Sequence, residues 1–158
     1  MGCAWPMLDQ LDRLAAEASA LHNRLVLVVG KPGAGKSGLL RQLADRRSTP
    51  VLNLGIKFSR RTAALPKRQR ALQATTVLRE TAAAHGEGQT LIADNLEVLF
   101  DRGLQMDPLD ALRRLSHGRT LVVAWPGTVC AGRLTYASPE HPEHQDYPAT
   151  GLVLLQLP

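Results

Sequence analysis

The sequence predicts an α/β fold in which helices cover both faces of a central, mostly parallel sheet of five strands. Five short runs of apolar and β-branched residues are separated by segments in which apolar residues recur at helical spacing, and strands that alternate with helices form parallel sheets. The 158 residues, of which 44% are hydrophobic, suffice for one domain with a proper core. We expect a single domain, 1–158, with an N-terminal helix in 1–23 and a core in 24–158.

The elements follow in chain order from this pattern. Apolar residues at helical spacing between Leu8 and Leu21 indicate a first helix that ends near His22–Asn23. The five strands are expected at Leu25–Val29, Val51–Leu54, Thr90–Ala93, Thr120–Trp125 and Leu152–Leu157. Gly55 closes the second strand, and the short apolar runs suit strands that are buried on both faces.

Three further helices are expected between the strands. The first covers Ser37–Arg46, and the second is a basic stretch over Ala63–Ala84 that is interrupted at Pro66. Asp107 or Asp110 opens the third, which stops at Gly118. We interpret Cys130–Tyr147 as a polar loop.

A glycine-rich segment lies between the first strand and the next helix. Residues 30–37 read G-K-P-G-A-G-K-S, a full match to the phosphate-binding loop (P-loop) pattern G-x-x-x-x-G-K-[ST]. Glycines let successive backbone N–H groups turn toward an anion, and the following helix adds its N-terminal partial charge. The sequence therefore predicts a P-loop NTPase, a three-layer sandwich that binds ATP or GTP with Mg²⁺. We take ATP as the expected ligand. The expected phosphate-binding residues are Gly30, Lys31, Pro32, Gly33, Ala34, Gly35, Lys36, Ser37 and Gly38.

A Mg²⁺ site needs a second element. In the P-loop pattern Lys36 contacts the β- and γ-phosphates, and the Ser37 hydroxyl is a Mg²⁺ ligand. The apolar run Thr90–Ala93 ends in Asp94, which is the Walker B pattern of an acid at the end of a buried strand. We expect Ser37 and Asp94 to form the metal side of the site.

The residue after Asp94 bears on turnover. P-loop ATPases of the additional-strand class place a Glu there to orient the attacking water, and this chain has Asn95. An amide can hydrogen-bond a water molecule but cannot take its proton. Glu97, two residues further on, is the candidate substitute. We expect slow hydrolysis, or none without a partner.

Charged residues elsewhere indicate two further functions. Arg114, on the helix before the fourth strand, is the first candidate for an arginine finger that would act on a neighbouring subunit of an ATP-dependent homo-oligomer, and the alternatives are Arg113, Arg102 and Arg133. A cluster of six cations without an acid is a candidate surface for double-stranded DNA, RNA or an acidic protein. Its members are Lys57, Arg60, Arg61, Lys67, Arg68 and Arg70. Apart from Phe58, the cluster lacks the aromatic residues of a single-strand stacking platform.

Charge, cysteine content and the length of apolar runs indicate the cellular location of the protein. The net charge is +5, and the two cysteines, Cys3 and Cys130, form no metal-like or disulfide-like pattern. No apolar run reaches the roughly 18 residues of a membrane span, and no secretory signal precedes the first helix. We expect a cytoplasmic protein without a membrane partner.

The chain resembles BrxF, the small P-loop protein of type III BREX bacteriophage-defence systems. The resemblance spans nearly the whole sequence and is most specific at Asp94-Asn95 and at the turn Trp125-Pro-Gly127. It implies an AAA-like nucleotide-binding core and a role beside other BREX proteins that modify host DNA and block phage replication. The chain ends just after the fifth strand, so we expect no helical lid domain.

Two alternatives to a nucleotide-driven switch or ATPase remain. A nucleotide-binding scaffold that never turns over is supported by Asn95. A small-molecule kinase would share the P-loop but would carry an acid after the second strand and an Arg-rich lid. The second strand here ends Asn53-Leu-Gly55, and Leu134–Tyr147 contains no Arg, so the kinase is the weakest alternative.

Overall fold

A central sheet of five parallel strands forms the middle layer of the computed structural model, which describes residues 4–21, 24–86 and 88–158. The strand order is β2-β3-β4-β1-β8, so β1 lies between β4 and β8, and every pairing is parallel. This confirms the predicted fold class. The strands are β1 (Leu25–Val29), β2 (Val51–Asn53), β3 (Thr90–Asp94), β4 (Thr120–Trp125) and β8 (Val153–Gln156).

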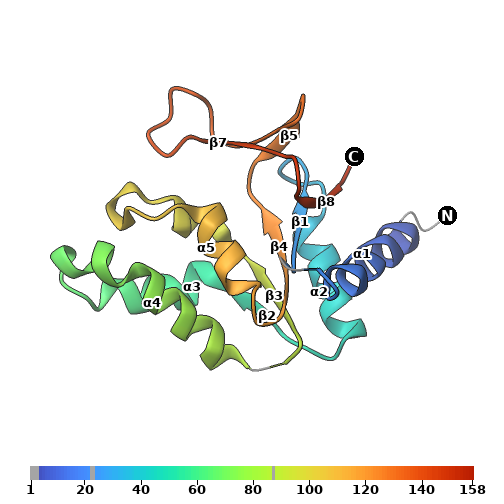
Figure 1. Cartoon of the computed structure of the whole chain (residues 1–158), viewed down its shortest axis with the longest axis horizontal. Coiled ribbons are helices and arrows are strands. Elements are labelled where there is room, and N and C mark those ends of the chain that lie inside the picture. Colours follow the sequence, from blue (N-terminus) through green and yellow to red (C-terminus); the bar gives the residue numbers. More distant parts are fainter. Residues whose placement is uncertain (1–3, 22–23, 87) are drawn as a thin grey trace.

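Helices cover both faces of the sheet (Figure 1). Alternate residues of β1 point to opposite faces, and each set belongs to a separate core. Val26 and Val28 pack with α1 (Ala4–Ala18) and α2 (Lys36–Arg46). Leu25, Leu27 and Val29 pack in the other core with α3, α4 and α5. Those helices are α3 (Leu54–Ala63), α4 (Lys67–His85) and α5 (Pro108–Leu115).

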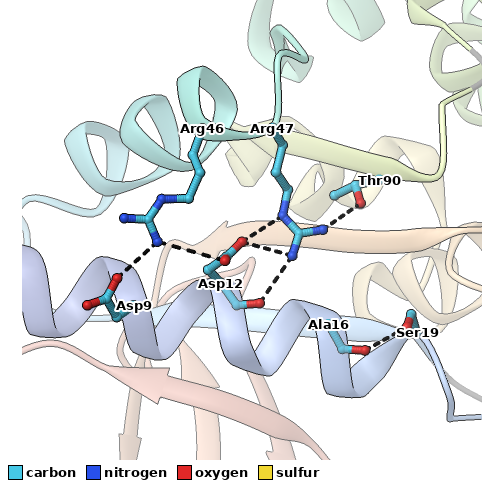
Figure 2. Close-up of polar contacts among 7 residues, drawn as sticks. All are labelled: Asp9, Asp12, Ala16, Ser19, Arg46, Arg47 and Thr90. Carbon is cyan, nitrogen blue, oxygen red and sulfur yellow. Dashed lines mark hydrogen bonds and ion pairs between the residues drawn. The ribbon is translucent and has the colours of Figure 1, made fainter.

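Ion pairs join the two helices of the first layer (Figure 2). Arg47 donates from Nε to the Asp12 carboxylate at 2.9 Å and also bonds the Asp12 carbonyl oxygen and the Thr90 hydroxyl. Arg46 bonds Asp9 at 3.0 Å. Arg47 therefore ties α1 and α2 to the start of β3.

The second helical layer differs from the sequence prediction at its start. Helix α3 begins at Leu54, directly after β2, whereas the second strand was expected to include Leu54 and to be closed by Gly55. The next helix was expected only from Ala63, which is the last residue of α3, so α3 itself was missed, and α4 begins at Lys67, just after the expected interruption at Pro66. The Asn53 side chain accepts a hydrogen bond from the Ile56 N–H and so caps this helix. Asp107, not Asp110, is the N-cap of α5, and that helix ends at Leu115.

A small antiparallel sheet follows β4, where a polar loop was expected. Strands β5 (Thr128–Cys130), β6 (Arg133–Tyr136) and β7 (Gln145–Pro148) pair in sequence order. The loop interpretation was wrong. These strands are short, and their residues are exposed or half-buried except for the fully buried Leu134, so they lack the apolar run that marks a core strand. Two short 3₁₀ segments, η1 (Leu96–Phe100) and η2 (Arg102–Leu104), connect β3 to α5.

In the part of the chain that the structure describes, only Leu157 and Pro158 follow β8. No helix in it is long and apolar enough to cross a membrane. The expected end of the first helix near His22–Asn23 lies outside the described residues.

Candidate nucleotide-binding site

The P-loop lies where β1 ends and α2 begins, at the carboxyl edge of the parallel sheet (Figure 1). Gly33 and Gly35 have left-handed backbones, with φ of 84° and 98°, and a Cβ on either would meet no atom within 4 Å. The space that a side chain would occupy at these two glycines is therefore open, and their backbone conformation disfavours any residue with a side chain. A bound anion would occupy this open side of the loop, next to the N-terminus of α2.

Lys36 spans the loop from its inner side. Its Nζ donates to the Gly30 carbonyl oxygen at 2.8 Å and to the Trp125 carbonyl oxygen at 3.1 Å. Burial lowers the pKa of the Lys36 ammonium from its ordinary value of 10.5, and the nearby carboxylates of Glu97 and then Asp94 oppose that shift. The cation is therefore held at the junction of β1 and β4 by backbone oxygens that a phosphate oxygen could replace.

Ser37 and Asp94 meet across the site. The Ser37 hydroxyl donates to a carboxylate oxygen of Asp94 at 2.5 Å, although the two residues are 57 positions apart. Both are oxygen ligands, and Mg²⁺ is commonly held by one or two such groups together with substrate phosphates. The pair therefore fits the metal side that the sequence predicted.

Asn95 adopts a left-handed backbone, with φ 61° and ψ 56°, directly after Asp94. Its N–H donates to the other Asp94 carboxylate oxygen at 2.8 Å. Asn is one of the few residues with a side chain that tolerate this conformation. The backbone at this position therefore favours Asn over the Glu of other P-loop ATPases, and its N–H holds the Asp94 carboxylate in place.

Glu97 lies in η1 with an exposed side chain. Its charge acts on the pKa of Lys36 more strongly than that of Asp94 does. It also lines a pocket of about 360 Å³ between α3, α4 and η1. This position leaves Glu97 near the phosphate side of the site and open to solvent.

An apolar pocket of about 300 Å³ adjoins the P-loop on the α2 side. Met7 of α1, Leu39 of α2 and Leu157 line it with apolar side chains, and Gln42 adds an amide. None of these four residues was predicted to belong to the site. No signal could have found them, because three segments far apart in the chain meet only in the fold.

Arg114 lies far from the P-loop of its own chain. It lines a pocket with Gly88 and Gln89, which precede β3, so it is placed at the amino edge of the sheet. Its Nε pairs with Asp110 at 3.0 Å. Arg114 therefore has no route to its own site, and its expected action on a neighbouring subunit stays a prediction.

The predicted basic cluster lies on α3 and α4. Lys57, Arg60 and Arg61 are exposed on α3, and Lys67 and Arg68 are exposed at the start of α4. Arg70 differs because it is half-buried and donates to the Leu65 and Ala63 carbonyl oxygens. Arg70 therefore holds the α3–α4 turn.

Solved structures share this architecture. A DNA replication initiation factor matches with a TM-score of 0.53 at 13% identity, over 94% of this chain and 44% of that chain. AMPPCP-bound DnaA from Aquifex aeolicus gives 0.52 at 13% identity, over 95% and 44%. Drosophila ORC bound to DNA gives 0.52 at 21%, over 99% and 43%. No protein-family model and no curated protein matches the sequence.

These similarities define the class of the fold. At such identities they show the fold alone, an α/β core with a parallel five-stranded sheet, and the P-loop of this chain lies at the carboxyl edge of that sheet. The chain spans less than half the length of each of these structures. Nucleotide binding agrees with this fold, whereas the activity and partners of this chain are matters for proposal.

Proposed function

We propose that this chain is an ATP- and Mg²⁺-binding P-loop protein that acts as a nucleotide switch, with weak or partner-stimulated ATPase activity, in a BREX anti-phage complex. The contact between Ser37 and Asp94 at 2.5 Å carries the nucleotide part of the proposal. It brings a P-loop hydroxyl and a strand-end carboxylate together beside Lys36, which is the arrangement that Mg²⁺–nucleotide binding requires.

The apolar pocket beside the P-loop supports a nucleoside triphosphate as the ligand. Its volume of about 300 Å³ and its apolar wall suit a purine base, and Gln42 could hydrogen-bond the ring edge. In this arrangement the loop would bind the phosphates, and Met7, Leu39 and Leu157 would contact the base.

Weak turnover follows from the groups near the phosphate side. Asn95 cannot accept a proton, and its N–H is engaged with Asp94. Glu97 is the nearby carboxylate that could act as a base, and its exposure leaves it without a fixed orientation. A partner or a second subunit that fixes the Glu97 side chain would therefore raise the rate, and Arg114 of a neighbouring copy is our candidate for stabilising the transferring phosphoryl group.

Binding is tested first by isothermal titration of ATP with Mg²⁺. We expect Lys36→Ala to weaken binding by about 100-fold, because a charged contact to phosphate is lost. Arg41→Ala removes an exposed cation from the same helix outside the loop and is the matched control, with unchanged affinity. Unchanged ATP affinity in a folded Lys36→Ala variant would contradict the site.

Turnover distinguishes the switch from its alternative, a scaffold that binds ATP and never hydrolyses it. Phosphate release and molar mass by light scattering should be measured together, with and without double-stranded DNA. Turnover that rises with assembly and falls in Arg114→Ala and Glu97→Gln would support the switch. Tight binding without turnover in every condition would favour the scaffold, which Asn95 supports.

The BREX setting rests on the resemblance over nearly the whole chain. It is tested by co-expressing the tagged chain with the remaining proteins of a type III BREX system and purifying the tag with and without ATP. We expect ATP-dependent co-purification that Lys36→Ala abolishes. Absence of every BREX protein from the wild-type eluate would contradict this part of the proposal and leave the nucleotide site intact.

A further inference from the structure

A long stretch of this chain carries positive charge only. From Arg46 to Arg79 there are nine Lys and Arg residues and no Asp or Glu. This stretch includes all of α3 and more than half of α4, which pack side by side (Figure 1). Charge of one sign over two adjacent helices produces a local field far stronger than the net charge of +5 suggests.

Exposed cations occur on both helices. Lys57, Arg60 and Arg61 are three and four residues apart on α3, so they share one face. On α4, Arg68 and Arg79 are the two ends of a row of exposed positions with a spacing of four, three and four, and the uncharged Leu72 and Thr75 lie between them. Arg79 thus extends the cluster predicted from the sequence, whereas Arg70 leaves it. We call the exposed set the α3–α4 basic face: Lys57, Arg60, Arg61, Lys67, Arg68 and Arg79.

No member of this face forms an ion pair within the described part of the chain. The ion pairs found there involve Arg46, Arg47, Arg114 and Arg133, and none includes a member of the face. From Arg68 to Arg79 the stripe is about 16 Å long at 1.5 Å per residue. That length corresponds to about five base pairs at 3.4 Å per pair along one strand.

Burial of Phe58 favours double-stranded over single-stranded nucleic acid as the ligand of this face. Phe58 is the one aromatic residue of α3 and α4, and it is only 1% exposed in the core. Binding of single strands relies on exposed aromatic side chains on which bases stack. The face offers cations without such a platform, which suits the outer phosphates of a duplex.

Apolar exposure argues against a protein partner. Leu72 is 84% exposed and Ile56 51% exposed, and they are the two large exposed apolar side chains of α3 and α4. Protein interfaces have a contiguous apolar centre and are depleted in Lys, whereas interfaces with nucleic acid are more polar and far more positive. Scattered single apolar side chains are normal on a surface.

We propose that the α3–α4 basic face binds the phosphate backbone of a nucleic-acid duplex. The proposal deepens the role suggested for the chain beside proteins that act on DNA, and it does not require the nucleotide site. The cations neutralise phosphates and release counterions, so binding depends steeply on salt.

The test is the anisotropy of a fluorescein-labelled 20-base-pair DNA duplex between 50 and 200 mM NaCl. With up to six phosphates neutralised, the plot of log K against log salt should have a slope of about −3 to −5. The triple variant Arg60→Gln, Arg61→Gln, Arg68→Gln should bind the duplex at least ten-fold more weakly. Its slope of log K against log salt should be less negative by about 2 to 3. Arg13→Gln, Arg41→Gln, Arg102→Gln removes the same charge from exposed sites on other elements and should change little.

Each result has a defined meaning. Equal loss in the two triple variants would overturn the proposal, because net charge rather than this face would then drive binding. Tighter binding of a single strand than of the duplex, or equally effective competition by polyglutamate, would overturn it in favour of stacking or of an acidic protein. Normal duplex binding by Lys36→Ala would support it and would show that this face acts apart from the nucleotide site.

Discussion

Asn95 shows how one residue can have both a structural and a chemical meaning. Sequence reasoning treated it as the replacement of a catalytic Glu. The structure places it in a left-handed conformation in which its N–H bonds Asp94. A Glu at φ 61° would be strained by about 1 kcal/mol or more. The backbone that orients the metal-side carboxylate thus favours Asn, and this could not be read from the sequence because φ is set by the turn from β3 into η1.

Gly127 is the glycine whose missing side chain matters most among those described. A Cβ there would overlap the backbone carbonyl of Thr135 and lie 2.8 Å from Trp125 Nε1. That carbonyl also accepts the hydrogen bond of the buried Trp125 indole at 3.1 Å. We expect Gly127→Ala to lower the free energy of unfolding by about 2 to 3 kcal/mol, from overpacking and a weakened hydrogen bond. Urea unfolding measures this value.

Gly118 provides the matched control for Gly127→Ala. A Cβ at Gly118, in the turn before β4, would meet nothing within 4 Å, and its φ lies outside the left-handed region. Gly118→Ala should therefore change the free energy of unfolding by less than about 0.5 kcal/mol. Equal destabilisation by both variants would show that the steric contact between Thr135 and a side chain at position 127 is not the cause of the stability loss.

At the scale of elements, the sequence predicts what local pattern determines. The P-loop, its strand and its helix carry strong local signals, and β1, β4 and α2 lie where they were expected. Helix α3 was missed because Gly55 suggests a strand end, and the expected helix began only at Ala63, where α3 ends. In the structure, a Cβ on Gly55 would approach the Asn95 Cβ to 3.2 Å, so the glycine permits a close tertiary contact. Asn53 as a helix cap, followed by Leu54, Phe58 and Thr62 at spacing of four, was the available signal.

The small sheet β5–β7 is fastened to α5 through Tyr147. Its hydroxyl donates to the Asp107 carboxylate at 2.9 Å, and the same oxygen of Asp107 caps α5. Burial first, and then this hydrogen bond, raise the pKa of Tyr147 well above its ordinary value of 10. The folded chain therefore keeps a proton that the unfolded chain loses, so this contribution to stability is complete below pH 10 and declines as the pH rises further.

Tyr147→Phe tests that attachment. At pH 7 the variant should lose about 1 kcal/mol of unfolding free energy, because the Asp107 hydrogen bond is absent. Between pH 9.5 and 11 its stability should fall less steeply than that of the wild type, since the raised pKa is removed. Tyr136, whose pKa burial also raises, remains in both proteins and accounts for the residual slope. Parallel pH profiles of the two proteins would contradict this account of Tyr147.

At the scale of the molecule, strand order is the feature that the sequence could not supply. Apolar runs identify five strands, but nothing local states that β1 lies between β4 and β8. That order brings Lys36 to the Trp125 carbonyl, and the neighbouring β3 brings Asp94 to Ser37. The candidate site thus follows from residue types that sequence patterns predict and from a topology that only the fold reveals.

Because the site exists only in the folded chain, Mg²⁺–ATP should stabilise the whole molecule. Ligand at 100 times its Kd adds about 2.7 kcal/mol, or roughly 5 to 11 °C in Tm for a domain of this size. ATP without Mg²⁺ should raise Tm by a smaller amount, because only the loop and Lys36 then contribute to binding.

The variant Asp94→Asn tests the metal side of the site. It should keep the smaller Tm increase with ATP alone and lose the further increase with Mg²⁺, because an amide is a far poorer Mg²⁺ ligand than a carboxylate. Asp45→Asn, at an exposed acid on α2, should keep both shifts. Thermal unfolding of the wild type, Asp94→Asn and Asp45→Asn, measured side by side, distinguishes these outcomes. If Mg²⁺ raised the Tm of Asp94→Asn as much as that of the wild type, the metal would lie away from the Ser37–Asp94 pair.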